Sequence, residues 1–188
     1  MKIAVSLALI SLLSTATPSR AAEPVAVLGL PLGGKLPTPV RQCKHELPKR
    51  AVTVCWIYSS KGHGGNVSGG LRVPGQDDRP AWAAYAQFEA KFTRDGTLRE
   101  FTVESDESHS FKTIVDSISA RFGRPANPAP LPSYSGYASW DRQEIGISIL
   151  CKKGGKCYTK FSSADLAADN RKRLQEVVKR NAARPIAP

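Results

Sequence analysis

Hydrophobic and polar residues alternate between positions 84 and 92, which predicts a β-strand with one buried face. The apolar positions of this pattern are Ala84, Ala86, Phe88, Ala90 and Phe92. Asp95-Gly96 follows, and a second run with strand character extends over 97–104. Because Asp-Gly between two such runs is typical of a tight turn, we predict a β-hairpin here.

A helical period replaces this alternation after residue 110. One apolar stripe is formed by Phe111, Ile114, Val115, Ile118 and Phe122, at spacings of three and four. Ser108 or Ser110 is suited to cap the start of this helix, and Gly123 and Pro125 end it. We therefore predict a helix over 111–122 that packs its stripe on a sheet.

The C-terminal third returns to strand patterns and then to a second helix. Strands are expected at 137–140, 145–149 and 157–161, in the order of a meander. Ser162-Ser163-Ala164-Asp165 resembles a capping box and opens a helix that runs to about residue 180. This helix has a thinner apolar stripe, formed by Leu166, Leu174, Val177 and Val178.

The N-terminal third contains one clear strand, over 52–57. We expect a short strand and a turn within 22–42, and a glycine-rich loop over 59–70, SSKGHGGNVSGG. The pattern as a whole predicts an α+β fold, an antiparallel sheet of about five to seven strands with two helices packed on it and two disulfides. The order of the strands in the sheet cannot be derived from the pattern.

The composition is that of a globular protein, with 188 residues, 41% hydrophobic and 23% charged. Lys2, an apolar run over 3–13 and Ser19-Arg20-Ala21 are typical of a secretory signal, with cleavage after Ala21 or Ala22. We expect a signal peptide at 1–21, one α+β domain at 22–182 and a flexible tail at 183–188. The protein is therefore predicted to be periplasmic or secreted, with no transmembrane segment after cleavage.

The four cysteines lie in the exported part, and an even count there indicates two disulfides. Local spacing favours Cys43–Cys55 and Cys151–Cys157. The second pair would flank a hairpin with a three-residue loop, 153–155, in which Gly155 is left-handed. A metal site is the alternative, but neither pair has C-x-x-C spacing, so we predict no metal and no cofactor.

The chain has a formal net charge of +11, and its basic residues are clustered. We take as candidate binding residues the basic side chains of the predicted hairpin and C-terminal helix, with one neighbouring ring: Lys152, Lys153, Lys156, Tyr158, Arg171, Lys172 and Lys179. Such patches attract an envelope polyanion or an acidic protein partner, although a charged run also serves simply as a solvated face. Tyr158, Tyr134 and Tyr137 could stack on bases or sugars, or fill the core.

No catalytic motif stands out in the chain. The G-x-S-x-G elbow is absent, and the histidines are scattered at His45, His63 and His109. We therefore favour a non-enzymatic interaction protein. A secreted hydrolase or nuclease that uses His63 or His109 is one alternative. An inhibitor or immunity-type protein that presents the Cys151–Cys157 hairpin as a rigid probe is the other.

Several segments together resemble those of small exported proteobacterial domains of uncharacterised function. They are 92–98 (FTRDGTL), 111–125 with its Phe-Gly-Arg-Pro end, Ser139-Trp140, 145–150, and Gly29–Gly33 followed by Cys43. The resemblance implies a periplasmic α+β domain. It transfers no catalytic residue.

Overall fold

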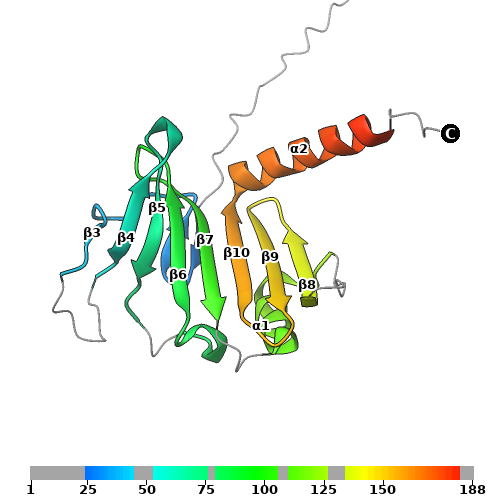
Figure 1. Cartoon of the computed structure of the whole chain (residues 1–188), viewed down its shortest axis with the longest axis horizontal. Coiled ribbons are helices and arrows are strands. Elements are labelled where there is room, and N and C mark those ends of the chain that lie inside the picture. Colours follow the sequence, from blue (N-terminus) through cyan, green and yellow to red (C-terminus); the bar gives the residue numbers. More distant parts are fainter. Residues whose placement is uncertain (1–23, 45–52, 76–78, 106–109, 127–133, 183–188) are drawn as a thin grey trace, which may run out of the picture.

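A computed structural model describes residues 24–44, 53–75, 79–105, 110–126 and 134–182. Its secondary structure is α+β, as predicted (Figure 1). The strands are β1 (Val25–Val27), β2 (Leu30–Leu32), β3 (Arg41–Gln42), β4 (Cys55–Lys61), β5 (Val67–Arg72), β6 (Gln87–Phe92), β7 (Leu98–Ser105), β8 (Tyr134–Asp141), β9 (Ile145–Lys152) and β10 (Cys157–Ser163). The helices are α1 (Phe111–Phe122) and α2 (Ala164–Ala182), with short 3₁₀ turns η1 (His63–Gly65) and η3 (Ala81–Ala83).

Eight strands form one sheet in the order β3-β4-β5-β6-β7-β10-β9-β8, and β1 and β2 form a separate hairpin. Every neighbouring pair is antiparallel except β3 and β4, which are parallel. The sheet is larger than the predicted five to seven strands. The difference arises at β3, which was not expected, and at β4 and β5, which extend through most of the segment expected to be a loop.

The predicted glycine-rich loop over 59–70 is wrong, because most of this segment belongs to β4 and β5. Ser59 pairs with Gly69, and Tyr58 pairs with Gly70. A Cβ atom on Gly69 would lie 2.1 Å from the backbone oxygen of Tyr58. Glycine therefore stands in this strand because a neighbouring backbone approaches closely, rather than because the chain turns. Only η1 and its flanks form the turn.

The β6–β7 hairpin confirms the prediction from Asp95-Gly96. The backbone N–H of Thr93 donates to the carbonyl of Thr97, and Gly96 has φ +85°. The strand starts later than expected, at Gln87. Ala84 and Ala86 donate instead to the carbonyls three residues before them, so the chain continues the turn of η3 there. Alanine has weak strand preference, and the local turn prevails.

Helix α1 has the bounds predicted for it. The Ser110 hydroxyl accepts from the backbone N–H of Thr113 at 3.2 Å, and Gly123 ends the helix with φ +76°. Ile114 and Ile118 are buried, and Phe111, Val115 and Phe122 pack at the margin of the core. The stripe therefore faces the sheet, as the spacing indicated.

Both predicted disulfides are present, Cys43–Cys55 and Cys151–Cys157. Cys151 pairs directly with Cys157 across the β9–β10 ladder. The loop at the tip differs from the prediction, since Gly154 and not Gly155 is left-handed, with φ +58°. Gly154 is the third residue of a turn closed by a hydrogen bond from Gly155 N–H to the Lys152 carbonyl, the position where glycine relieves a positive φ.

The two faces of the sheet have different surroundings. Helix α1 and the β1–β2 hairpin lie behind the sheet in Figure 1, and the core lies between them and the strands. We call this side the inner face and the opposite side the outer face. Helix α2 begins at the end of β10 and projects past β8 (Figure 1). Among the described residues, no helix is long and apolar enough to cross a membrane.

Candidate functional site: the outer face of the sheet

The strand register arranges the outer-face side chains in three rows that run across the sheet. The first row is Ser60, Ser68, Lys91, Glu100, Ser162, Gly146 and Asp141; the second is Tyr58, Gly70, Glu89, Thr102, Lys160, Ser148 and Ser139; the third is Gln87, Glu104, Tyr158, Leu150 and Tyr137. Each row is a line of cross-strand neighbours about 5 Å apart. Residues distant in sequence therefore meet on one surface.

Helix α2 covers only the end of this surface. A Cβ atom on Gly146 would lie 3.0 Å from the Cβ of Ala167, so the helix rests directly on β9 there. Arg99, which sits at a bulge of β7, pairs with Asp165 at 2.6 Å and with Asp169 at 3.5 Å. These contacts fix the first turns of α2 and leave the middle of the outer face open.

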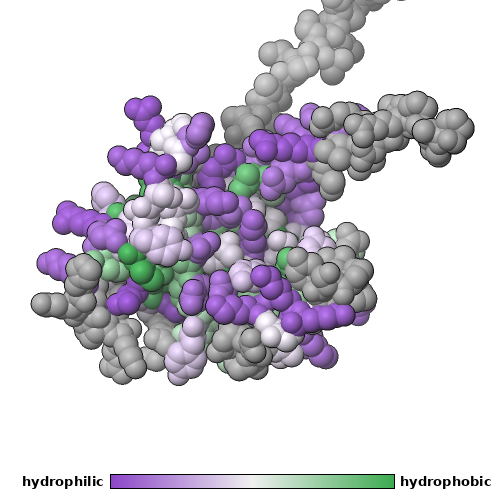
Figure 2. Space-filling view, viewed as in Figure 1, coloured by the Kyte–Doolittle hydropathy of each residue, from purple (hydrophilic) through white to green (hydrophobic). Residues whose placement is uncertain are grey.

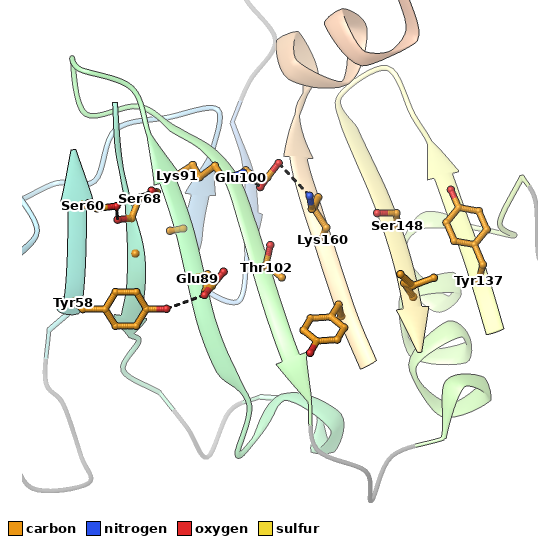
Figure 3. Close-up of a pocket in the computed structure, with 14 residues that line it drawn as sticks. Tyr58, Ser60, Ser68, Glu89, Lys91, Glu100, Thr102, Tyr137, Ser148 and Lys160 are labelled. Carbon is orange, nitrogen blue, oxygen red and sulfur yellow. Dashed lines mark hydrogen bonds and ion pairs between the residues drawn. The ribbon is translucent and has the colours of Figure 1, made fainter. Parts of the chain in front are cut away.

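Tyr58 lies flat over the sheet, because Gly70 beside it has no side chain. A Cβ atom on Gly70 would lie 2.6 Å from the Tyr58 ring. The Tyr58 hydroxyl donates to Oε1 of Glu89 at 2.8 Å (Figure 3). This hydrogen bond raises the pKa of the hydroxyl, and desolvation and the charges of Glu89 and Glu104 raise it further. The ring itself is 55% exposed.

Glu100 is the one carboxylate of this face that is nearly buried, at 8% exposure. It lies between two lysines from neighbouring strands, with Lys91 Nζ 2.7 Å from Oε1 and Lys160 Nζ 3.6 Å from Oε2. A buried charge needs such partners to offset its loss of hydration. Glu100 thereby directs two half-exposed lysines toward one point on this face.

A hollow of about 570 Å³ lies over these residues, within the usual size range of small-molecule sites. Gly69, Thr102 and Ser148 line it where side chains are short, and Tyr58, Tyr137 and Tyr158 line it with rings. Figure 3 shows Tyr58 and Tyr137 on strands at opposite ends of the labelled group, with Thr102 and Lys160 between them. Hydroxyl, carboxylate, ammonium and aromatic groups therefore face one open space.

A second hollow of about 610 Å³ adjoins the first along β4, β5 and β6. Tyr85 and Ile57 line it and are 81% and 51% exposed. Figure 2 shows a small hydrophobic area over β4 and β5 on a face that is otherwise mostly hydrophilic. Ring surface is thus available beside the charged groups.

The candidate binding residues of the hairpin lie in two different environments. Tyr158 lines the first hollow, and Lys152 Nζ lies 5.4 Å from the centre of its ring. Lys156 pairs with Glu104, and Lys153 is exposed in the turn. Of the predicted binding residues, Tyr158 alone lines the hollow.

The predicted residues of α2 lie at the other end of the sheet. Arg171 pairs with Asp141 of β8, and Lys172 and Lys179 are exposed. Strand β10 separates them from the hairpin by about 20 Å, at about 3.3 Å per residue. The structure therefore does not join the two basic clusters into one surface. The side chains of Leu174, Val177 and Val178 lie outside the described part of the structure.

The histidines give no catalytic arrangement among the described residues. His63 is exposed in η1 and lines a smaller hollow with Lys91, Arg99 and Glu100. His45 and His109 lie outside the described residues. No group of three or more His, Cys, Asp or Glu side chains is placed to hold a metal within the described ranges.

Sequence reasoning missed Tyr58, Glu89, Lys91 and Glu100 as site residues. The alternation over 87–92 did place Glu89 and Lys91 on the face opposite Phe88 and Phe92, so part of the signal was present. Tyr58 was missed because its strand was expected to end at residue 57. Comparison of the chain with protein-family models, curated proteins and solved structures found no match.

Proposed function

We propose that this protein is an exported, non-enzymatic binding protein that takes a component of the cell envelope on the outer face of its sheet. The signal-like sequence at 1–21 and the two disulfides support export to the periplasm or beyond. The observation that carries the proposal is the open middle of the outer face. There, rings and fixed charged groups surround a hollow of about 570 Å³.

Fixed side chains favour binding because little conformational entropy is lost when a ligand arrives. Glu100 holds Lys91 and Lys160, and Glu89 holds Tyr58. An outer face that served only for solubility would need neither a buried carboxylate nor a ring laid over a glycine.

A matched pair of tryptophan variants tests the proposal. Thr102→Trp fills the hollow, whereas Ala120→Trp adds the same ring at an exposed position of α1, on the other side of the sheet. The probes are labelled heparin, cellotetraose and chitotetraose, with the oxidised exported chain. We expect at least one probe to bind, Thr102→Trp to weaken it tenfold or more, and Ala120→Trp to leave it unchanged. Binding that both variants leave intact, or no binding of any probe, overturns the proposal.

A polyanion on the hairpin end is a second candidate, favoured by one observation. Ser110, Phe111 and Lys112 of α1 and Lys152 of β9 line a hollow of about 490 Å³ beside the hairpin turn. Lys153 lies in that turn, so this end presents basic side chains to one space. An acidic protein partner, or the target of an inhibitor hairpin, would meet the same charges.

Salt dependence separates this candidate from the first. Heparin bound at the hairpin end should be released between about 50 and 300 mM salt, because counterion release drives such binding. Lys152→Glu with Lys153→Glu should abolish it, while Lys172→Glu on α2 should change it little. Heparin binding that persists in the double variant contradicts a hairpin site.

A further inference from the structure

The two hollows on the outer face form one trough. Both are lined by Tyr58 and Glu89, so these two residues lie at their junction. From there the trough extends toward Thr102, Lys160 and Tyr137 on one side and toward Tyr85 on the other. An elongated ligand fits this shape better than a single compact molecule does. This step rests on the proposed function, because it assigns the ligand of the same face.

The charges that line the trough nearly balance, with four basic and three acidic side chains, although the whole chain carries +11. The first hollow is lined by two lysines and two glutamates, and the second by two arginines and two glutamates, of which Glu89 is shared. Several are already used within the protein, since Lys91 and Lys160 pair with Glu100 and Lys156 pairs with Glu104. A polyanion would have to displace these partners, so the trough favours a ligand without net charge.

The polar groups of the trough favour hydroxyl groups on that ligand. A carboxylate only accepts hydrogen bonds and an ammonium only donates them, whereas a hydroxyl does both. Glu89 accepts from Tyr58 through Oε1, and its other oxygen is available to accept from a ligand. Hydroxyls can therefore bond to Glu89, Glu100, Lys160 and Thr102 in turn without separating the ion pairs.

The tyrosine rings favour a ligand made of rings that each have one apolar face. Tyr58 lies along the sheet over Gly70, and Tyr85 is the most exposed ring among the side chains that the structure describes. A tyrosine ring is apolar on its face and polar at its hydroxyl. It therefore suits a ligand ring that is apolar on one face and carries polar groups at its edge. A peptide in extended form instead binds the edge of a sheet through its backbone, and this trough lies on the face.

We infer that the trough binds a neutral, linear oligosaccharide, with one sugar ring stacked on Tyr58 and its hydroxyls bonded to Glu89. Tyr85 and Tyr137 lie toward the two ends of the bound chain. The preference for an uncharged saccharide over a polyanion follows from the nearly balanced lining of the trough and from the ion pairs that already engage its charges.

Calorimetric titration of the oxidised exported chain with cellotetraose, maltotetraose and fully N-acetylated chitotetraose tests this inference. We expect at least one of these to bind, with an affinity that changes less than twofold between about 50 and 300 mM salt, because no counterions are released. Tyr58→Ala should weaken binding tenfold or more through loss of the ring. Tyr58→Phe keeps the ring and should weaken it about threefold or less, a small loss for one hydrogen bond.

Two further variants test whether the carboxylate of Glu89 contributes to binding. Glu89→Gln should weaken binding severalfold. Glu144→Gln should leave binding unchanged, because Glu144 is exposed in the turn between β8 and β9 and lines neither hollow. Thermal unfolding of each variant confirms that the fold is retained. If none of the three saccharides binds at millimolar concentration, the inference is overturned.

The same titrations separate the failure of this inference from failure of the proposed function. Heparin binding that Thr102→Trp blocks, with no binding of the three neutral tetrasaccharides, would keep the outer face as the binding surface and overturn the assignment of a neutral oligosaccharide. Saccharide binding that Tyr58→Ala and Thr102→Trp both leave intact would overturn the two proposals together.

Discussion

Phe88 and Phe101 stack on the inner face with ring centres 5.6 Å apart, while Glu89 and Thr102, the next residues along the same strands, face the open hollow. The inner side chains are closely packed between the strands, α1 and the β1–β2 hairpin. The outer side chains are held by hydrogen bonds and ion pairs, and their rings and polar ends stay accessible. One face is thus organised by packing and the other by polar contacts, which is the arrangement expected where stability and binding are separated.

Neighbouring positions on β7 give the sharpest contrast between the faces. Phe101 is fully buried, so Phe101→Ala should reduce the free energy of unfolding by about 3–5 kcal/mol through lost burial and a new cavity. Thr102→Ala, one residue away on the outer face, should change it by about 0.5 kcal/mol or less. Urea unfolding of the two variants measures both. Similar losses for the two would mean that the outer face is part of the packed structure.

Gly69→Ala tests whether β4 and β5 depend on a glycine at the point where their backbones approach closely. A Cβ atom there would approach the Tyr58 carbonyl to 2.1 Å, so β4 must move, at a cost of about 1–3 kcal/mol. Gly62→Ala is the matched control, because Gly62 has φ −95° and its nearest atom would be 3.8 Å away. We expect the first variant to unfold at lower urea and the second to match the parent. Equal midpoints would contradict the close approach of the two strands.

Substitution of Asp95 should have the smallest effect on stability. Asp95 lies in the β6–β7 turn, which fixes the register of the two strands and therefore which of their side chains lie on each face. Its carboxylate accepts hydrogen bonds from Thr93 and Thr97 and lies 3.2 Å from Lys35, which lowers its pKa to about 2. A pKa below the unfolded value means that the stabilisation is present above about pH 4 and is lost as the pH falls toward 2. A one-residue slip in this hairpin would exchange the two faces.

Asp95→Asn should therefore flatten the dependence of the urea midpoint on pH between about pH 4 and 2. Glu144→Gln controls for the loss of one negative charge at an exposed site. If the parent and Asp95→Asn lose stability equally over this range, the carboxylate does not hold the turn.

The parts of the fold that depend on local chemistry could be predicted from the sequence. Helix α1 was predicted with its apolar stripe and its C-terminal end, and with Ser110 as one of two possible caps, because these are all local signals. The disulfide between Cys151 and Cys157 was predicted because a short hairpin brings its ends together. The β4–β5 hairpin was not predicted from its glycines. Gly69 is required because the carbonyl of Tyr58 on the neighbouring strand approaches it closely, and this contact is not a local signal.

The outer-face site was harder to predict because the order of the strands determines it. Tyr58, Glu89, Thr102 and Lys160 come from β4, β6, β7 and β10, and they share one row only through that order. Sequence reasoning grouped the lysines by their nearness along the chain. The fold leaves Lys153 in the hairpin turn, as predicted, and places Lys160, which was not among the candidate binding residues, in the hollow.

Chemical-shift mapping of backbone amides during titration with the tightest-binding tetrasaccharide shows directly whether the outer face binds the ligand. We expect the perturbed amides to lie on β4, β5, β6, β7 and β10 along the rows through Tyr58, Glu89 and Thr102. The inner-face helix α1 and the exposed part of α2 should remain unperturbed. Perturbations confined to α2 or to the β9–β10 turn would contradict the claim that the outer face is the binding surface.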